Sequence, residues 1–95
     1  MTMHRIYCDL IAGTAKPVSV EVFDLNGGTY YKAYDGSLRP VDGEKLFSGE
    51  RSISTGWHAS QADAYAEAAD ELARRVRAVA ALRLTCRAAA EVLHV

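Results

Sequence analysis

Apolar and polar residues alternate with a period of two over much of the first 60 positions, a pattern typical of β-strands. The predicted strands are 4–12, 18–25, 29–34 and 51–58. A turn is expected at 13–17, where Gly and Pro interrupt the pattern. The stretch 37–50 holds Pro, two Gly and several charges, so we expect a loop there with at most a short extended piece at 45–48.

The dipeptide Asn26-Gly27 predicts a hairpin between the second and third strands, because both residues tolerate the positive φ of a type I′ turn. This turn places Phe23 opposite Tyr30 and Val22 opposite Tyr31, whereas a turn at Gly27-Gly28 would shift the partners by two and leave the faces unchanged. One face of the hairpin then carries Val20, Val22, Tyr31 and Ala33. The other face carries Phe23, Tyr30, Lys32 and Tyr34, with Tyr7 from the first strand. We expect the valine face to be the one that a helix covers.

The chain from 61 to 95 predicts a long helix, because it contains neither Gly nor Pro and is rich in alanine. Ser60 is a suitable N-cap, with Asp63 three residues later. Apolar residues recur at three- and four-residue spacing and form one stripe. Its members are Ala62, Tyr65, Ala69, Leu72, Val76 and Val79, with Ala66, Ala73 and Ala80 beside them. This stripe is expected to pack on the sheet.

The same stripe continues into Arg83 and Arg87, and burying an unpaired arginine is costly. The apolar residues of the second half lie roughly 100° around the helix from the stripe. They are Leu82, Cys86, Ala89 and Leu93. Either the helix breaks or kinks near 82–85 and folds back, or the second half extends past the sheet and pairs with a second subunit.

Together these elements predict a single α+β domain over 1–95. Its sheet of three to four antiparallel strands occupies 1–58 and its helical part 61–95. The length of 95 residues fits one domain, and the composition of 49% apolar and 24% charged residues is that of a folded protein. The net charge of -1 argues against general binding to the phosphate backbone of nucleic acids, which usually needs a basic protein.

Two cysteines, Cys8 and Cys86, are too few for a disulfide framework or a zinc site. Free thiols of a reducing cytosol are expected, although a bridge between the two stays open. The N-terminal residues resemble neither a signal peptide nor a membrane span, so the expected location is the cytoplasm.

Two sets of side chains are candidate interaction surfaces. The first joins the aromatic sheet face to the second half of the helix: Phe23, Tyr30, Lys32, Tyr34, Leu82, Cys86 and Leu93. The second is a basic patch on the helix: Arg74, Arg75, Arg77, Arg83 and Arg87. Aromatic residues on a sheet can stabilise the fold, cover an interface or stack nucleic-acid bases. Pairing with Glu67 and Glu71 and the helix dipole account for most of the arginine pattern, and a surface for phosphate is the alternative.

No motif predicts catalysis, a cofactor or a metal. His4 and Cys8 would lie about 13 Å apart along a strand, too far for one metal ion. His58 could meet Asp63, and a lone contact of this kind is usually structural. The glycine pair at 27–28 precedes a strand and not a helix, unlike a phosphate-binding loop. The sequence therefore favours a non-enzymatic binding or assembly module that forms a homodimer. The alternative is a nucleic-acid-binding module that uses the aromatic sheet face and the helix arginines.

Overall fold

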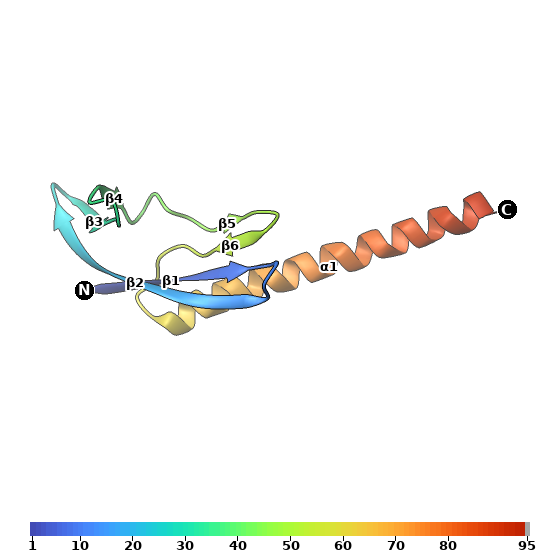
Figure 1. The fold of residues 1–95 in the computed structure, drawn as a ribbon, viewed down its shortest axis with the longest axis horizontal. Coiled ribbons are helices and arrows are strands. Elements are labelled where there is room, and N and C mark those ends of the chain that lie inside the picture. Colours follow the sequence, from blue (N-terminus) through green and yellow to red (C-terminus); the bar gives the residue numbers. More distant parts are fainter. Residues whose placement is uncertain (95) are drawn as a thin grey trace.

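The computed structural model describes residues 1–94 and shows an α+β fold (Figure 1). Six antiparallel strands form one curled sheet in the order β4-β3-β2-β1-β6-β5. The strands are β1 Thr2–Asp9, β2 Thr14–Leu25, β3 Gly28–Lys32, β4 Leu38–Pro40, β5 Phe47–Ser48 and β6 Ser52–Ser54, and the helix is α1 Gln61–His94. The prediction of three to four strands is too low by two or three. β4 and β5, which are very short, form within the predicted loop 37–50 by pairing with β3 and β6.

The hairpin of β2 and β3 confirms the predicted turn and its register. Phe23 pairs with Tyr30 and Val22 with Tyr31. Asn26 has φ 51° and Gly27 has φ 81°, the backbone that a type I′ turn requires.

The turn between β1 and β2 lies earlier than predicted, at Leu10–Gly13 instead of 13–17. The Asp9 carboxylate accepts hydrogen bonds from the amides of Ile11 (2.9 Å) and Ala12 (3.0 Å), which fixes the turn. Pro17 therefore lies inside β2, opposite Ile6. The backbone of Ile6 bonds to Thr55 on the other side, so the nitrogen of Pro17 faces the open edge of β2, where no donor is needed.

The core lies between α1 and the strands β1 and β6. Ile6, Cys8 and Ile53 are buried against Ala64 and Ala68 of the helix. The helix thus packs through small side chains and not through the predicted stripe, whose Leu72 is 36% exposed and whose Val76 is 67% exposed. Alanine lets the helix backbone approach the sheet closely, whereas the prediction gave weight to the larger apolar residues.

The helix also covers the opposite sheet face from the one predicted. Arg5 pairs with Val18 and Met3 with Val20, so these valines lie on the side of β1 that faces away from Ile6 and the helix. This side is the inner face of the curled sheet.

A bulge redirects the end of the last predicted strand. Tyr7 pairs with Ser54, and His4 bridges to His58. The step from Tyr7 to His4 is three residues along β1, whereas the step from Ser54 to His58 is four residues along the chain that follows β6. One extra residue reverses the facing of the side chains that follow it. Trp57 consequently contacts Arg5 on the inner face, on the opposite side of the sheet from the buried Ile53.

The helix α1 is continuous, so of the two alternatives the break near 82–85 is not observed and the helix extends past the sheet. The hydroxyl of Thr85, within this region, donates to the Ala81 carbonyl (3.2 Å) of α1. At 1.5 Å per residue the helix is about 51 Å long. The molecule measures 66 × 23 × 22 Å, because the helix runs well past the sheet (Figure 1). The last position of the predicted helical region, residue 95, lies outside the described residues. No helix within residues 1–94 is long and apolar enough to cross a membrane.

Candidate interaction surfaces

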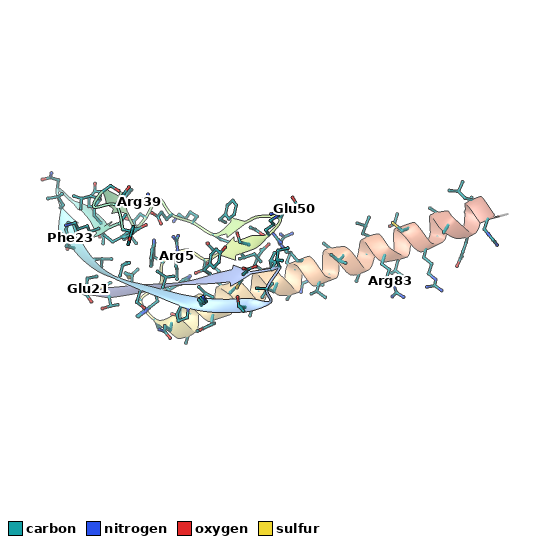
Figure 2. All side chains as sticks on the ribbon, viewed as in Figure 1. Arg5, Glu21, Phe23, Arg39, Glu50 and Arg83 are labelled. Carbon is teal, nitrogen blue, oxygen red and sulfur yellow. The ribbon has the colours of Figure 1, made fainter. Side chains whose placement is uncertain are left out.

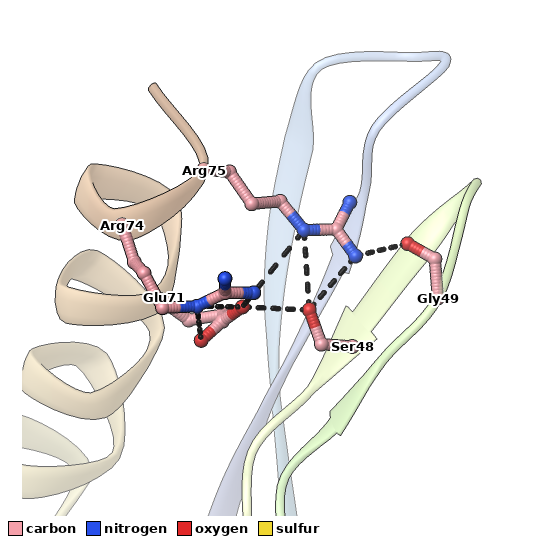
Figure 3. Close-up of polar contacts among 5 residues, drawn as sticks. All are labelled: Ser48, Gly49, Glu71, Arg74 and Arg75. Atoms are coloured by element: carbon pink, nitrogen blue, oxygen red, sulfur yellow. Dashed lines mark hydrogen bonds and ion pairs between the residues drawn. The ribbon is translucent and has the colours of Figure 1, made fainter. Parts of the chain in front are cut away.

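An ion-pair cluster marks the point where α1 leaves the sheet (Figure 3). Ser48 donates a hydrogen bond to the Glu71 carboxylate (2.7 Å), and Arg74 Nε donates to both carboxylate oxygens (3.0 Å each). Arg75 Nη2 donates to the hydroxyl of Ser48 (2.8 Å) and to the carbonyl of Gly49. The helix is thereby attached to the turn between β5 and β6.

The carboxylate of Glu71 is held ionised by this cluster. Hydrogen bonds from Arg74 and Ser48 lower its pKa to about 2, outweighing its burial, and the positive charges of Arg74 and Arg75 act in the same direction. The prediction that Glu71 reaches these two arginines is confirmed, with Arg75 Nε 3.9 Å from the carboxylate. The other predicted partner, Glu67, contacts His58 instead.

The five arginines of the predicted basic patch do not form one surface. Arg74 and Arg75 are engaged in the cluster, while Arg77, Arg83 and Arg87 lie on the exposed part of the helix. At about 100° per residue, Arg77 lies about 120° around the helix from Arg83.

Beyond Arg75 every described residue of the helix is exposed, and we call residues 76–94 the projecting segment. Its surface is uneven. From Ala78 onward the charged and histidine side chains fall on one narrow strip at spacings of three and four: Arg83, Arg87, Glu91 and His94. Most of the remaining surface is apolar.

One apolar side of the projecting segment continues the line along which α1 packs on the sheet. The packed line is Ala64, Ala68, Glu71 and Arg75. The continuation, which we call the seam face, is Val79, Leu82, Cys86, Ala89 and Leu93. Both sets lie within about 40° of the same direction at 100° per residue. The apolar direction therefore does not rotate between the two halves of the helix. The sheet simply ends.

An apolar groove of about 410 Å³ lies where the sheet ends. It runs between Leu10 at the β1–β2 turn and the side chains of Leu72, Val76 and Val79. Because Val79 belongs also to the seam face, the groove and the seam face form one exposed apolar surface.

The predicted aromatic sheet face is divided by the structure. Phe23 and Tyr30 are paired at the far end of β2, where Figure 2 labels Phe23, and Phe23 remains partly exposed. The fully exposed Tyr34 instead lines a groove on the inner face of the sheet, and Lys32, at the last position of β3, borders this groove. The predicted homodimer surface thus occupies two separate regions, because Leu82, Cys86 and Leu93 lie on the projecting segment.

A polar network on the inner face was not predicted. Glu44 accepts hydrogen bonds from the Tyr31 hydroxyl (2.6 Å) and from Trp57 Nε1 (3.1 Å). It also pairs with Arg5 Nη1 at 3.0 Å, and the Arg5 guanidinium lies 4.3 Å from the centre of the Trp57 ring. Burial acts to raise the pKa of Glu44, but the two hydrogen bonds and the Arg5 charge leave it below its ordinary value. Nothing in the local sequence links a loop glutamate to these three residues.

The histidine contact differs from the one predicted. Nε2 of His58 lies 3.1 Å from Glu67 and not against Asp63. Glu67 also accepts the amide of Gly56 (2.7 Å), so it ties the segment before the helix to α1. Ser60 caps the helix as predicted, accepting the amide of Asp63 (3.1 Å).

Both cysteines are free thiols in the described chain. Cys8 is buried, and this burial raises the pKa of its thiol. Cys86 is exposed on the seam face. No group of three His, Cys, Asp or Glu side chains among residues 1–94 gathers to hold a metal ion.

Comparison with known proteins gives no relationship: no family model matches the chain, and neither does any curated protein or solved structure.

Proposed function

We propose that this protein is an assembly module whose copies pair through the seam face of the projecting segment. The observation that carries the proposal is the run of large apolar side chains there, with Leu82 62% and Leu93 85% exposed. They lie in direct continuation of a face that the sheet covers. Apolar surface of this kind, contiguous and bordered by charged residues, is typical of interfaces between proteins.

A second copy of this chain fits the seam face because the face is self-complementary about Cys86. Val79 and Leu93 each lie seven positions from Cys86, on either side of it. In an antiparallel pair with a two-fold axis at Cys86, Val79 of one copy meets Leu93 of the other. The strip of Arg83, Arg87 and Glu91 lies to one side of the seam, so pairing buries none of these charges.

The sheet itself favours the antiparallel arrangement. It occupies the same side of α1 between Ala64 and Arg75, so a parallel neighbour along the seam face would meet it. An antiparallel neighbour overlaps only residues 78–94 and holds its own sheet at the opposite end.

The expected dimer is concentration-dependent. Pairing would cover six large side chains, namely Val79, Leu82 and Leu93 from each copy, each worth roughly 1–2 kcal/mol. This gain is of the same order as the cost of association, about 4–15 kcal/mol. We place the assembly in the cytoplasm, where Cys86 stays reduced.

A matched pair of leucines tests the proposal. Leu82 lies on the seam face, whereas Leu84, 66% exposed, lies about 160° away on the same helix. Leu82→Asp should raise the dissociation constant measured by light scattering over a range of concentrations about a hundredfold or more, since it places a carboxylate in an apolar interface. Leu84→Asp should leave it nearly unchanged. A wild-type chain that stays monomeric at every concentration, or equal effects of the two variants, would contradict the proposal.

Disulfide trapping in a Cys86→Ser background tests whether the two helices of the pair run antiparallel or parallel. Val79→Cys and Leu93→Cys chains, mixed under mild oxidation, should cross-link with each other more than either does with itself. Parallel pairing would give the reverse, with like chains joined.

The alternative of a nucleic-acid-binding module has less support. Its surface combines Lys32 and the tyrosines with the late arginines. Lys32 and three of the tyrosines border the groove in the sheet beside Arg39, whereas Arg83 lies on the part of the helix beyond the sheet, as Figure 2 shows for the two labelled arginines.

A further inference from the structure

We infer that the groove on the inner face of the sheet binds a small planar aromatic ring that carries an anionic group. The groove has a volume of about 590 Å³, within the range of small-molecule sites. It lies in the sheet, away from the projecting segment, so this inference stands independently of the proposed assembly.

The floor of the groove is apolar and aromatic. Val18 and Val20 of β2 lie beside Tyr31 and Trp57, whose ring centroids are 5.0 Å apart. Tyr7 from β1 completes this floor and is partly exposed, as is Val18. Apolar side chains left open to solvent beside aromatic rings favour a flat, apolar ligand.

One cation at the end of the groove is available to an anion. Arg39 lines the groove and forms no ion pair with any described residue. Arg39 pairs with Tyr31 across β3 and β4, so it lies on the same face as the aromatic floor, whereas Lys32, the next residue of β3, points to the opposite face. A guanidinium without an ion-pair partner is a typical partner for a phosphate or carboxylate.

The other charged groups of the groove are already occupied. Arg5 is neutralised by Glu44 and donates to the Thr55 carbonyl (3.1 Å). Asp35 accepts the hydroxyl and the amide of Ser37, which hold its pKa below the ordinary value. On this face of the sheet, Arg39 is thus the cation that no carboxylate of the described residues pairs with.

The aromatic floor is preorganised. Glu44 holds Arg5, Tyr31 and Trp57 together through three polar contacts, so the ring of Trp57 is in place before a ligand arrives. Sites fixed in this way lose less entropy on binding.

Trp57, the single tryptophan of the chain, reports on the groove directly. Two matched pairs of probes separate the ring from its charge: adenosine monophosphate against adenosine, and benzoate against benzamide. We expect saturable changes in tryptophan fluorescence, with at least one anion binding about tenfold or more tighter than its neutral counterpart. The pair that responds tells whether phosphate or carboxylate is preferred.

Arg39→Ala should weaken binding of that anion about tenfold and leave the neutral probe unaffected. The matched control is Arg51→Ala, which removes the same charge from an exposed side chain at the β5–β6 end of the sheet. The absence of saturable binding by either anion would overturn the inference. So would equal affinity for charged and neutral probes, or equal effects of the two arginine variants.

Discussion

The two halves of α1 differ in what covers the same side of the helix. In the first half that side carries Ala64 and Ala68, and the sheet buries both. In the second half it carries Leu82 and Leu93, and no described residue covers them. Alanine allows close contact with a sheet, and in the proposed pair the larger residues would meet a second helix at a wider separation.

The comparison shows that amphipathic pattern alone does not identify the packed face of an alanine-rich helix. The stripe with the larger apolar residues, including Leu72 and Val76, lies about 90° from the face that the sheet covers. Three variants in the first half of α1 test which face of the helix packs on the sheet.

The largest effect is expected where α1 is closest to the sheet. Ala64 is fully buried, so Ala64→Leu should force the helix from β1 and lower the free energy of unfolding by about 1–3 kcal/mol. Urea denaturation followed by circular dichroism measures this loss. Ala66→Leu, on an exposed position of the same turn, should change it by less than about 0.5 kcal/mol. Equal losses would mean that the helix packs through another face.

A smaller, pH-dependent effect is expected at Glu71. Its pKa of about 2 in the folded protein lies below the value of about 4.5 for an unpaired glutamate. The stabilisation is therefore complete above pH 4.5 and is lost as the pH falls from 4.5 to about 2. Glu71→Gln should remove this part of the acid dependence, and Asp70→Asn, in an exposed neighbour, should not. Thermal denaturation between pH 2 and pH 7 compares them, and identical curves for the two variants would contradict the role given to the cluster.

The smallest effect is expected at Leu72. Its pattern alone suggests a core position, yet its side chain is 36% exposed beside the apolar groove. Leu72→Asp should therefore lower the free energy of unfolding by only about 1 kcal/mol, leaving the domain folded. Lys32→Ala provides the exposed reference with no loss of stability. If Leu72→Asp unfolded the domain completely, the helix would have to pack on the sheet through the stripe that contains Leu72.

Features fixed by neighbouring residues could be predicted from the sequence. Asn26-Gly27 determines its own turn and hence the register of the hairpin, and Ser60 caps the helix through a contact three residues away. The helix itself follows from its alanine content and the lack of Gly and Pro.

Features that depend on contacts between distant segments could not be predicted. The bulge before His58 changes the side on which Trp57 lies, and only the bridge to His4 reveals it. Glu44 lies in an irregular loop, where no periodicity assigns it a face. The inner groove therefore cannot be predicted from the sequence, although Lys32 and Tyr34, which border it, belong to a predicted interaction surface.

The length of α1 has a consequence for how the molecule moves in solution. Its radius of gyration is 18.3 Å, whereas a compact domain of 95 residues has about 12 Å. A particle about three times longer than wide diffuses more slowly than a sphere of equal mass. A single chain should thus elute from a sizing column ahead of compact standards of its own mass and resemble a larger species. The N–H bonds of α1, which are aligned with the long axis, should also reorient more slowly than those in the sheet, as nuclear magnetic relaxation would measure.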